Sequence, residues 1–482
     1  MSIKTCDLAI TGGTVIDGTG KPRFEADLAV SGDRIVALGD ITAFRAQRTL
    51  DASGRIVAPG FIDAHTHDDN LLLRRPDMAP KTSQGVTSVV VGNCGVSLAP
   101  IAMDRAPPPP MDLLGGREDY HFASVADYAA RLKATPPATN VAMLVGHSTL
   151  RVGAMDDLAR PARPNEMDCM AERLDEGMKA GAIGLSTGLF YPTNSAAPTE
   201  EVIALAKIAA AHGGIYTTHM RDEHDGVETS LDETFRIGRE AKIPIVISHH
   251  KVAGVKNFGR SKATLAKIEA ARATQTIGLD VYPYIAGSTV LLDTLIPGAA
   301  RVIITWSKAR PEMAGRELST IAKDWGVEPL EAAKRLQPAG AIYFMMDEAD
   351  VRRIIAYPHS MIGSDGLPHD ERPHPRLWGT FPRVLGHYAR DVGLLTLEDA
   401  VHRMTGLTAR TFGFKDRGEL RVGAAADIVV FDAATIAARA DFDHPLEPAA
   451  GIDHVIVNGE AVWQEGRATG ARPGLVLRRA GG

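Results

Sequence analysis

The chain has 482 residues, of which 45% are hydrophobic and 23% are charged, a composition typical of a large globular protein and not of a disordered one. Its 53 basic and 59 acidic residues give a net charge of -6, so no basic excess is present that would bind nucleic acid. Cys6, Cys94 and Cys169 are too few and too far apart for a disulfide framework, and no run reaches the roughly 18 apolar residues that span a membrane.

The chain begins with MSIKTCDLAITGG, which has no apolar core of signal-peptide length, and we expect a cytoplasmic protein with no membrane partner. Short strand-like runs with glycine turns occupy residues 7–17, 27–39 and 55–60, and similar runs return at 418–432 and 454–463. Strand-rich pieces at opposite ends of a chain can pair with each other. We therefore predict one β-sandwich domain made of residues 1–58 and 414–482.

In the middle of the chain, residues 59–413, short β-branched runs alternate with helical patterns. Two examples of these patterns are 165–181 and 199–214, and the first has an Asn cap and a Gly stop. Eight such units favour a closed, parallel (β/α)8 TIM barrel, and an open doubly wound sheet is the second possibility. The eight strand-like runs are 61–65, 87–94, 141–147, 182–187, 214–219, 243–249, 277–284 and 359–365.

The connection between the seventh and eighth runs is about 75 residues long, whereas one βα unit of a barrel needs about 25–30. Helical patterns within it predict a small inserted subdomain at 286–348, over the mouth of the barrel. The stretch GLSTG at 184–188 matches the nucleophile elbow of serine hydrolases, but Tyr191-Pro192 follows where that motif requires a helix. We therefore set a serine hydrolase aside.

Residues that bind metals stand at the ends of five predicted strands. Active sites of such barrels lie at the C-terminal ends of the strands, so these side chains are expected to converge. A thiolate and imidazoles together with a carboxylate favour zinc. Each residue alone would be read as a core or turn residue, but the whole set falls at the same end of the barrel. The candidate ligands are His65, His67, Cys94, His219, His249 and Asp365.

The stretch PGFIDAHTH at 59–67 resembles the first strand of the metal-dependent amidohydrolase superfamily. The stretches VGNCGVS, GAIGLSTGLFYPT, ISHHK, DVYPY, GSDGLPHD and HPRLWGTF are similar to those of D-aminoacylases, the N-acyl-D-amino-acid deacylases. This resemblance, which covers essentially the whole chain, implies zinc-dependent hydrolysis of a small-molecule N-acyl-D-amino acid. It also implies that Cys94, His219 and His249 hold a tightly bound Zn2+. A second, weaker site would be bordered by His65, His67 and Asp365, with Cys94 as a possible bridge.

The resemblance also implies roles for residues around the metal. Asp365 would be the general base, and Tyr191 would help to polarise the carbonyl group. Four residues would bind the α-carboxylate of the substrate: Lys251, Tyr282, Ser288 and Arg376. An apolar pocket for the substrate side chain would be formed by Phe190, Tyr343 and Met346.

We expect a preference for neutral or hydrophobic D-residues, because LLDTLIP at 291–297 has no cation where relatives selective for D-glutamate carry an arginine. Arg301 could fill that place if the loop is shifted. Three alternatives stay open: an N-acyl-D-glutamate or D-aspartate deacylase, a cyclic amidase of the same superfamily, and a non-catalytic scaffold. The complete ligand set argues against the scaffold, and Cys94 with the carboxylate-binding residues argues against a hydantoinase.

Overall fold

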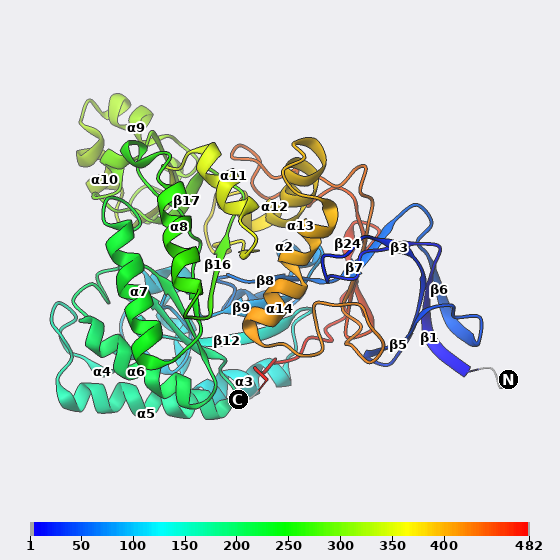
Figure 1. The fold of residues 1–482 in the computed structure, drawn as a ribbon. Coiled ribbons are helices and arrows are strands. Elements are labelled where there is room, and N and C mark those ends of the chain that lie inside the picture. Colours follow the sequence, from blue (N-terminus) through cyan, green and yellow to red (C-terminus); the bar gives the residue numbers. More distant parts are fainter. Residues whose placement is uncertain (1–3, 481–482) are drawn as a thin grey trace.

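A computed structural model describes residues 4–480 and shows a barrel joined to a strand-rich region that carries the N-terminus (Figure 1). Eight parallel strands form one sheet in the order β20-β16-β15-β14-β13-β12-β9-β8. Its edge strands meet where the Ala64 amide donates to the Ile362 carbonyl (3.3 Å) and Thr66 bridges to Gly366. The predicted (β/α)8 barrel is confirmed, and the open doubly wound sheet is excluded because the two edges meet.

All eight barrel strands lie within the predicted runs or overlap them. Each is buried along its length, which is why the sequence shows near-continuous apolar runs instead of alternation. In chain order the strands are β8 (Phe61–Asp63), β9 (Val86–Val91), β12 (Asn140–Gly146), β13 (Gly184–Gly188), β14 (Ile215–His219), β15 (Ile245–Ile247), β16 (Ile277–Val281) and β20 (Ser360–Ile362).

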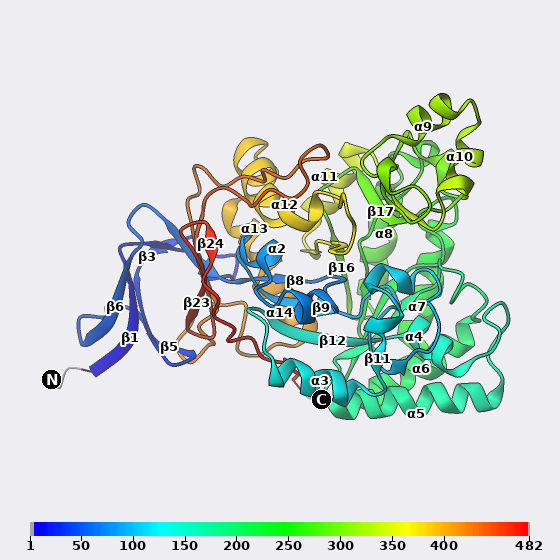
Figure 2. The same cartoon turned by 180° about the vertical axis from the view of Figure 1, so that it is seen from behind.

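Helices cover the outside of the barrel (Figures 1 and 2). The sequence predicted a helix at 165–181 that is capped by Asn165. The helix α5 begins one residue earlier, at Pro164, because proline is favoured in the first turn. It ends before Gly181, whose φ of 109° is the left-handed conformation that terminates a helix. The helices are α1 (Leu71–Arg74), α2 (Ala79–Thr82), α3 (Val125–Ala134), α4 (His147–Ala154), α5 (Pro164–Ala180), α6 (Thr199–Ala211), α7 (Val227–Ala241), α8 (Ser261–Arg272), α11 (Glu348–Ala356), α12 (Arg376–Arg383), the π-helical η6 (Val384–Asp391), α13 (Leu397–Met404) and α14 (Gly406–Phe412). Within residues 4–480, none of the helices is both long and apolar enough to cross a membrane.

The two chain ends meet in a pair of sheets that share an apolar core, which includes Ile10, Val30, Val57, Ile428 and Ile456. The first sheet, in the order β5-β4-β1-β6, comes from the N-terminal end alone, whereas the second, in the order β24-β23-β22-β21-β7-β2-β3, mixes both ends. The strands are β1 (Lys4–Thr11), β2 (Thr14–Val15), β3 (Phe24–Glu25), β4 (Asp27–Ser31), β5 (Arg34–Gly39), β6 (Phe44–Asp51), β7 (Ile56–Pro59), β21 (Ile428–Phe431), β22 (Ile452–Val457), β23 (Glu460–Gln464) and β24 (Arg467–Ala468).

After the second sheet the chain returns to the barrel. The Leu477 amide donates to the Val141 carbonyl (2.7 Å) at the N-terminal end of β12. There Leu477 joins Phe412 and Phe414 in the apolar cluster that fills the bottom of the barrel. The C-terminal segment therefore contributes to the barrel as well as to the sheets.

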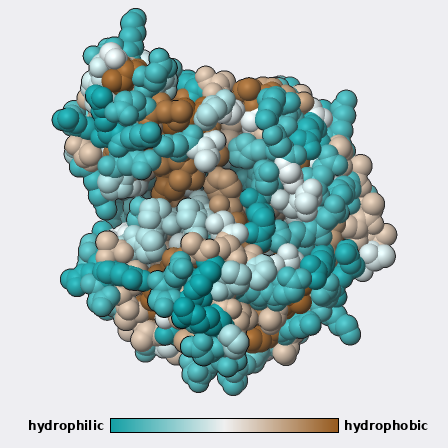
Figure 3. All heavy atoms as spheres, turned by 90° about the vertical axis from the view of Figure 1, so that its left-hand side faces the viewer, coloured by the Kyte–Doolittle hydropathy of each residue, from teal (hydrophilic) through white to brown (hydrophobic). Residues whose placement is uncertain are grey.

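The connection between β16 and β20 folds around a small antiparallel sheet of three strands, β17 (Ala286–Val290), β19 (Ala339–Phe344) and β18 (Arg301–Ser307). Two short helices, α9 (Leu318–Trp325) and α10 (Pro329–Leu336), lie beside it. The sequence indicated the helices but not the strands, which pair residues as far apart as Ala286 and Phe344. On the face drawn in Figure 3, hydrophobic side chains gather in a hollow below this part of the molecule.

Candidate active site

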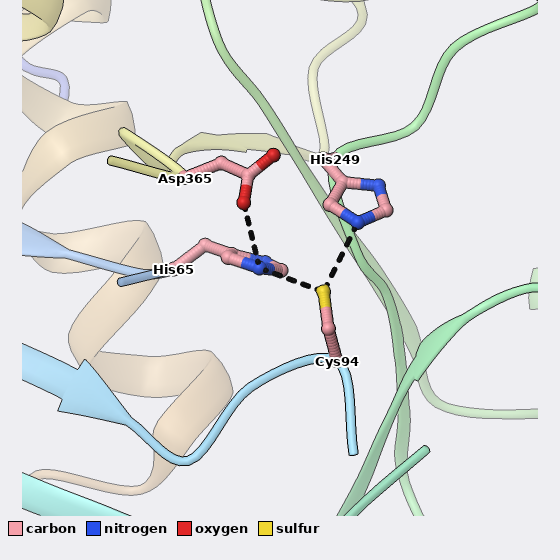
Figure 4. A group of neighbouring side chains, drawn as sticks. All are labelled: His65, Cys94, His249 and Asp365. Atoms are coloured by element: carbon pink, nitrogen blue, oxygen red, sulfur yellow. Dashed lines mark hydrogen bonds and ion pairs between the residues drawn. The ribbon is translucent and has the colours of Figure 1, made fainter. Parts of the chain in front are cut away.

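Four of the predicted ligand residues form a compact cluster at the C-terminal ends of the strands (Figure 4). The Cys94 sulfur lies 3.3 Å from His65 Nε2 and 3.2 Å from His249 Nε2. His65 Nε2 is also 3.5 Å from a carboxylate oxygen of Asp365. All four side chains are buried, and their ligand atoms lie within 4.8 Å of one another. One metal ion could contact all of them.

Three members of this cluster adopt a backbone conformation that is unusual for residues other than glycine. The φ angles are 53° at Cys94, 36° at His249 and 49° at Asp365. Such conformations cost free energy and persist only where the surrounding structure holds them, and they gather at functional sites. The barrel therefore holds these ligands in place at a cost to its own stability.

His67 and His219 complete the predicted set. His67 Nε2 lies 3.2 Å from Asp365, and the His219 ring stands at 84° to the His249 ring, with their centres 4.5 Å apart. Within the described residues, Nδ1 of His67 and Nδ1 of His219 are buried without a hydrogen-bond partner. Since buried nitrogen atoms are normally satisfied, these two orphaned atoms fit a bound cation. The donor set of sulfur, imidazole and carboxylate suits zinc.

The electrostatics of the cluster favour the ionised forms of two ligands. Burial opposes ionisation of Cys94, but the positive charges of His65 and His249 outweigh it and hold the pKa of the thiol well below its usual range. Burial of Asp365 is likewise outweighed by Arg376 and His249, which hold the pKa of this carboxyl well below its ordinary value. A thiolate and a carboxylate are the forms that bind a metal.

Glu223 connects the cluster to the wall of the cavity, and the sequence analysis did not identify it. Its carboxylate lies 3.0 Å from His249 Nδ1, 3.5 Å from His219 Nε2 and 2.7 Å from the Lys251 ammonium group. A carboxylate on the far nitrogen fixes the orientation of a histidine ligand, and here one carboxylate reaches two. The only signal in the sequence is an acidic residue four positions after His219.

Asp280, at the end of β16, has a similar role for another histidine. One of its oxygens accepts a hydrogen bond from the His249 amide (2.9 Å) and lies 3.4 Å from His65 Nδ1. Asp280 thus connects the backbone that carries one predicted ligand with the ring of another.

A cavity of about 550 Å³ opens above the cluster. The Arg376 guanidinium is fully buried, donates to the Ser288 carbonyl (3.1 Å) and lies 2.8 Å from Asp365. It stacks over the Tyr282 ring at 4.6 Å from the ring centre, while the Lys251 ammonium group lies 5.9 Å from that centre. Two cations and the Tyr282 hydroxyl, which is buried without a hydrogen-bond partner among residues 4–480, therefore face one part of the cavity.

Aromatic residues from the loop after β13 form another wall. The Phe190 ring stacks on the His219 ring at 5.5 Å, and the Tyr191 ring lies 4.9 Å from it. The Tyr191 hydroxyl is 3.1 Å from the Thr289 hydroxyl. Burial and the negative charge of Cys94 raise the pKa of Tyr191 well above its ordinary value, so its hydroxyl remains protonated.

The predicted apolar pocket is only partly assembled as expected. Tyr343 lines the cavity, and its hydroxyl accepts from the Leu292 amide (2.8 Å). Met346 does not line this cavity; it borders a separate, smaller one, whereas its neighbour Met345 does line the main cavity. Consecutive residues after a strand point in different directions, and the sequence could not show which of the two faces inward. Arg301 lies outside the cavity, paired with Glu317 at 3.0 Å.

Comparisons with known proteins agree with this geometry. Residues 48–463 match the profile of the Amidohydrolase family. The chain is 58% identical to a D-aminoacylase of Alcaligenes xylosoxydans xylosoxydans over 98% of both chains. It is 50% identical to an N-acyl-D-glutamate deacylase of the same organism, over 98% of this chain and 96% of that one.

A crystal structure of the N-acyl-D-glutamate deacylase of Bordetella bronchiseptica, complexed with zinc and a phosphonate inhibitor that mimics the tetrahedral intermediate, superimposes with a TM-score of 0.95. That protein is 49% identical, and the alignment covers 98% of this chain and 100% of the other. The barrel, the buried ligand cluster at its strand ends and these similarities lead to one conclusion: this chain belongs to the amidohydrolase family.

Proposed function

We propose that this protein hydrolyses the amide bond of N-acyl-D-amino acids with the help of zinc, giving a carboxylate and a free D-amino acid. The observation that carries the proposal is the position of Asp365. One of its oxygens lies 3.2 Å from His67 Nε2 in the ligand cluster, and the other lies 2.8 Å from Arg376 in the cavity. The carboxylate thus stands between the metal ligands and the group suited to a substrate carboxylate. The names of the relatives support the same reaction class.

We assign a tightly bound zinc to Cys94, His219 and His249. A second, weaker site would be bordered by His65, His67 and Asp365, with Cys94 close enough to His65 to bridge the two. Bound zinc lowers the pKa of water and polarises the amide carbonyl. The Nδ1 atoms of His67 and His219, which have no hydrogen-bond partner in the part of the chain that the structure describes, support this assignment.

Asp365 supplies the general base in this proposal. Arg376 and His249 hold its pKa low and keep it ionised at neutral pH, and the ionised carboxylate is the form that can take the proton of the attacking water. It then passes the proton to the departing nitrogen, without which an amine cannot leave. The Tyr191 hydroxyl, which stays protonated, donates a hydrogen bond to the carbonyl oxygen as negative charge develops there.

The α-carboxylate of the substrate binds Arg376, with Lys251 and the hydroxyl groups of Tyr282 and Ser288 completing the site. A guanidinium group offers two parallel donors to a carboxylate. Burial and the Lys251 and Arg376 charges act in opposite directions on Tyr282, and the net effect raises its pKa to about 12, so it donates a hydrogen bond.

We propose a preference for neutral or hydrophobic D-side chains. Phe190, Tyr343 and Leu295 line the cavity, and Met345 occupies the place that we had expected for Met346. Lys251 and Arg376 are already assigned to the α-carboxylate, so neither is left for a carboxylate on the substrate side chain. Deacylation of D-glutamate or D-aspartate derivatives is the second candidate, because two relatives of 50% identity are named N-acyl-D-glutamate deacylase and N-acyl-D-aspartate deacylase. The unpaired state of Cys6, Cys94 and Cys169 suits the cytoplasm, where we place the enzyme.

The test is amine release from N-acetyl-D-leucine, N-acetyl-L-leucine and N-acetyl-D-glutamate by zinc-loaded protein, with the ring opening of dihydrouracil followed separately by its loss of ultraviolet absorbance, because that reaction releases no amine. We expect turnover of the D-leucine derivative in preference to the other three. Turnover of dihydrouracil instead would identify a cyclic amidase. The Cys94→Ala variant is the control for the scaffold alternative: zinc content and turnover should fall together, whereas a scaffold would show no turnover with either protein.

A further inference from the structure

The residues assigned to the substrate carboxylate come from separate parts of the chain. Arg376 is the first residue of α12, which follows the last barrel strand, whereas Ser288 lies in β17, the first strand of the inserted connection. Among residues 4–480, the buried Nε of Arg376 and the buried Tyr282 hydroxyl have no hydrogen-bond partner. Such donors suit a ligand, but they can share one carboxylate with Ser288 only if β17 and the start of α12 are held in place relative to each other.

The strand β17 passes very close to this site. The Ser288 carbonyl accepts a hydrogen bond from the Arg376 guanidinium group (3.1 Å). At the preceding residue, Gly287, a Cβ atom would lie 3.0 Å from the Tyr282 hydroxyl oxygen. A side chain at this position would therefore crowd the hydroxyl group, and glycine lets the strand approach it.

His374 binds both parts of the site at once. Its Nε2 donates to the Ala286 carbonyl in β17 (3.0 Å), and its Nδ1 accepts a hydrogen bond from the Arg376 amide (2.9 Å). A histidine ring that donates at one nitrogen and accepts at the other is neutral. Burial and the positive charge of Arg376 hold the pKa of His374 well below its ordinary value, which agrees with this form.

The His374 ring is also packed firmly. Its side chain is 1% exposed, and the rings of Tyr284 and Phe442 stand at 87° and 77° to it, with their centres 5.0 and 5.1 Å away. His374 is not part of the lining of the active-site cavity, and within residues 4–480 the hydrogen bonds of its ring go to no metal ligand. It can therefore act on the site only through Arg376 and β17.

We propose that His374 is a positioning residue for the carboxylate site, where its neutral ring holds Arg376 and β17 at the spacing that lets both bind the α-carboxylate of one substrate. This inference rests on the proposed function and adds a residue that does not touch the substrate. Because the carboxylate keeps its charge while the amide bond breaks, the contact stabilises the bound substrate and the transition state alike. Loss of such a contact raises KM and leaves kcat nearly unchanged.

The test compares kcat and KM for N-acetyl-D-leucine in the zinc enzyme and in three variants. His374→Asn can still accept from the Arg376 amide, His374→Gln can still donate to the Ala286 carbonyl, and His374→Leu can do neither. We expect KM to rise about tenfold or more in His374→Leu and by less in the other two variants, while kcat stays within about threefold.

Loss of the packed ring should lower the unfolding temperature of all three variants, so circular dichroism and zinc content first establish which of them are folded. The Asn and Gln variants, which each keep one hydrogen bond, cover the case in which the leucine variant does not fold. His402→Gln is the matched control, because His402 also joins a carbonyl group, that of Gly18 (2.7 Å), to an N–H group, that of Arg410 (2.9 Å), outside the cavity. Its KM should not change.

The outcomes separate the two proposals. If the unmodified enzyme releases no amine from N-acetyl-D-leucine, the proposed function fails and the role of His374 fails with it. If the unmodified enzyme hydrolyses this compound but the folded His374 variants keep its KM, or if their kcat falls as strongly as their KM rises, only the role of His374 is overturned.

Discussion

At the N-terminal end of the barrel strands, Ile62, Val90 and Ile215 pack against Phe412 and Leu477 in an apolar cluster. At the C-terminal end of the same strands, the chain buries charged groups that pair with one another. Arg376, Lys251, Glu223 and Asp365 all lie there within reach of the ligand cluster.

The two ends differ in backbone geometry as well. The positive φ angles of Cys94, His249 and Asp365 are all at the C-terminal end. Burial of charges and strained backbone both cost free energy, whereas the apolar floor gains it. The barrel thus separates stability from chemistry along one axis, and a change at either end should affect one property more than the other.

The largest effect is expected at the C-terminal end. Asp365→Asn keeps the shape of the side chain but removes the general base, so kcat should fall about 100- to 10,000-fold. Zinc content, measured by mass spectrometry, should remain at one equivalent, and the unfolding temperature should fall, because the buried Arg376 loses its charged partner. A kcat within about threefold of the original would contradict the assigned role.

At the floor the effect should fall on stability. Phe412→Ala removes a fully buried ring that stacks on Phe414 at 6.1 Å, and it should lower the free energy of unfolding by about 3–5 kcal/mol. The kcat and KM values of the folded enzyme should stay the same, since the ring of Phe412 packs in a cluster to which Phe414 and Leu477 belong, at the other end of the strands from the ligands. Phe24→Ala is the matched control, because Phe24 is 40% exposed. A large change in kcat for Phe412→Ala would show that the two ends are not independent.

A smaller effect is expected at the C-terminal end from Glu223, which contacts the metal ligands but is not one of them. Glu223→Gln replaces the carboxylate shared by two histidines and Lys251, and zinc affinity should fall about 10- to 100-fold. Competition with a chelator measures this affinity without reference to turnover. KM should also rise, because Lys251 loses its partner. Glu228→Gln, which alters a surface pair with Arg260, should change neither the zinc affinity nor KM. If the two variants bind zinc with equal affinity, Glu223 does not support the metal ligands.

The smallest effect is expected just outside the cavity. Arg301 is 45% exposed and paired with Glu317, so Arg301→Ala should change the preference between N-acetyl-D-leucine and N-acetyl-D-glutamate by less than about twofold. The ratio of the two kcat/KM values is the measurement. A strong loss of activity on the glutamate derivative alone would place Arg301 in the substrate pocket.

The sequence alone determined the barrel and the residues that point into its mouth. Buried parallel strands produce continuous apolar runs, and the residue that ends each run is local information, so His65, Cys94, His219, His249 and Asp365 could be placed at one end of the fold. The β-rich chain ends and the long connection after β16 were visible for the same reason, because they are changes of pattern along the chain.

Only the tertiary structure decided how neighbouring side chains divide between surfaces. That Met345 and not Met346 lines the cavity depends on the direction in which the chain leaves β19. That Glu223 reaches both His219 and His249 depends on loops from different strands meeting in space. Such contacts join residues far apart in the chain and have no periodicity, and it is the closure of the barrel that brings them together.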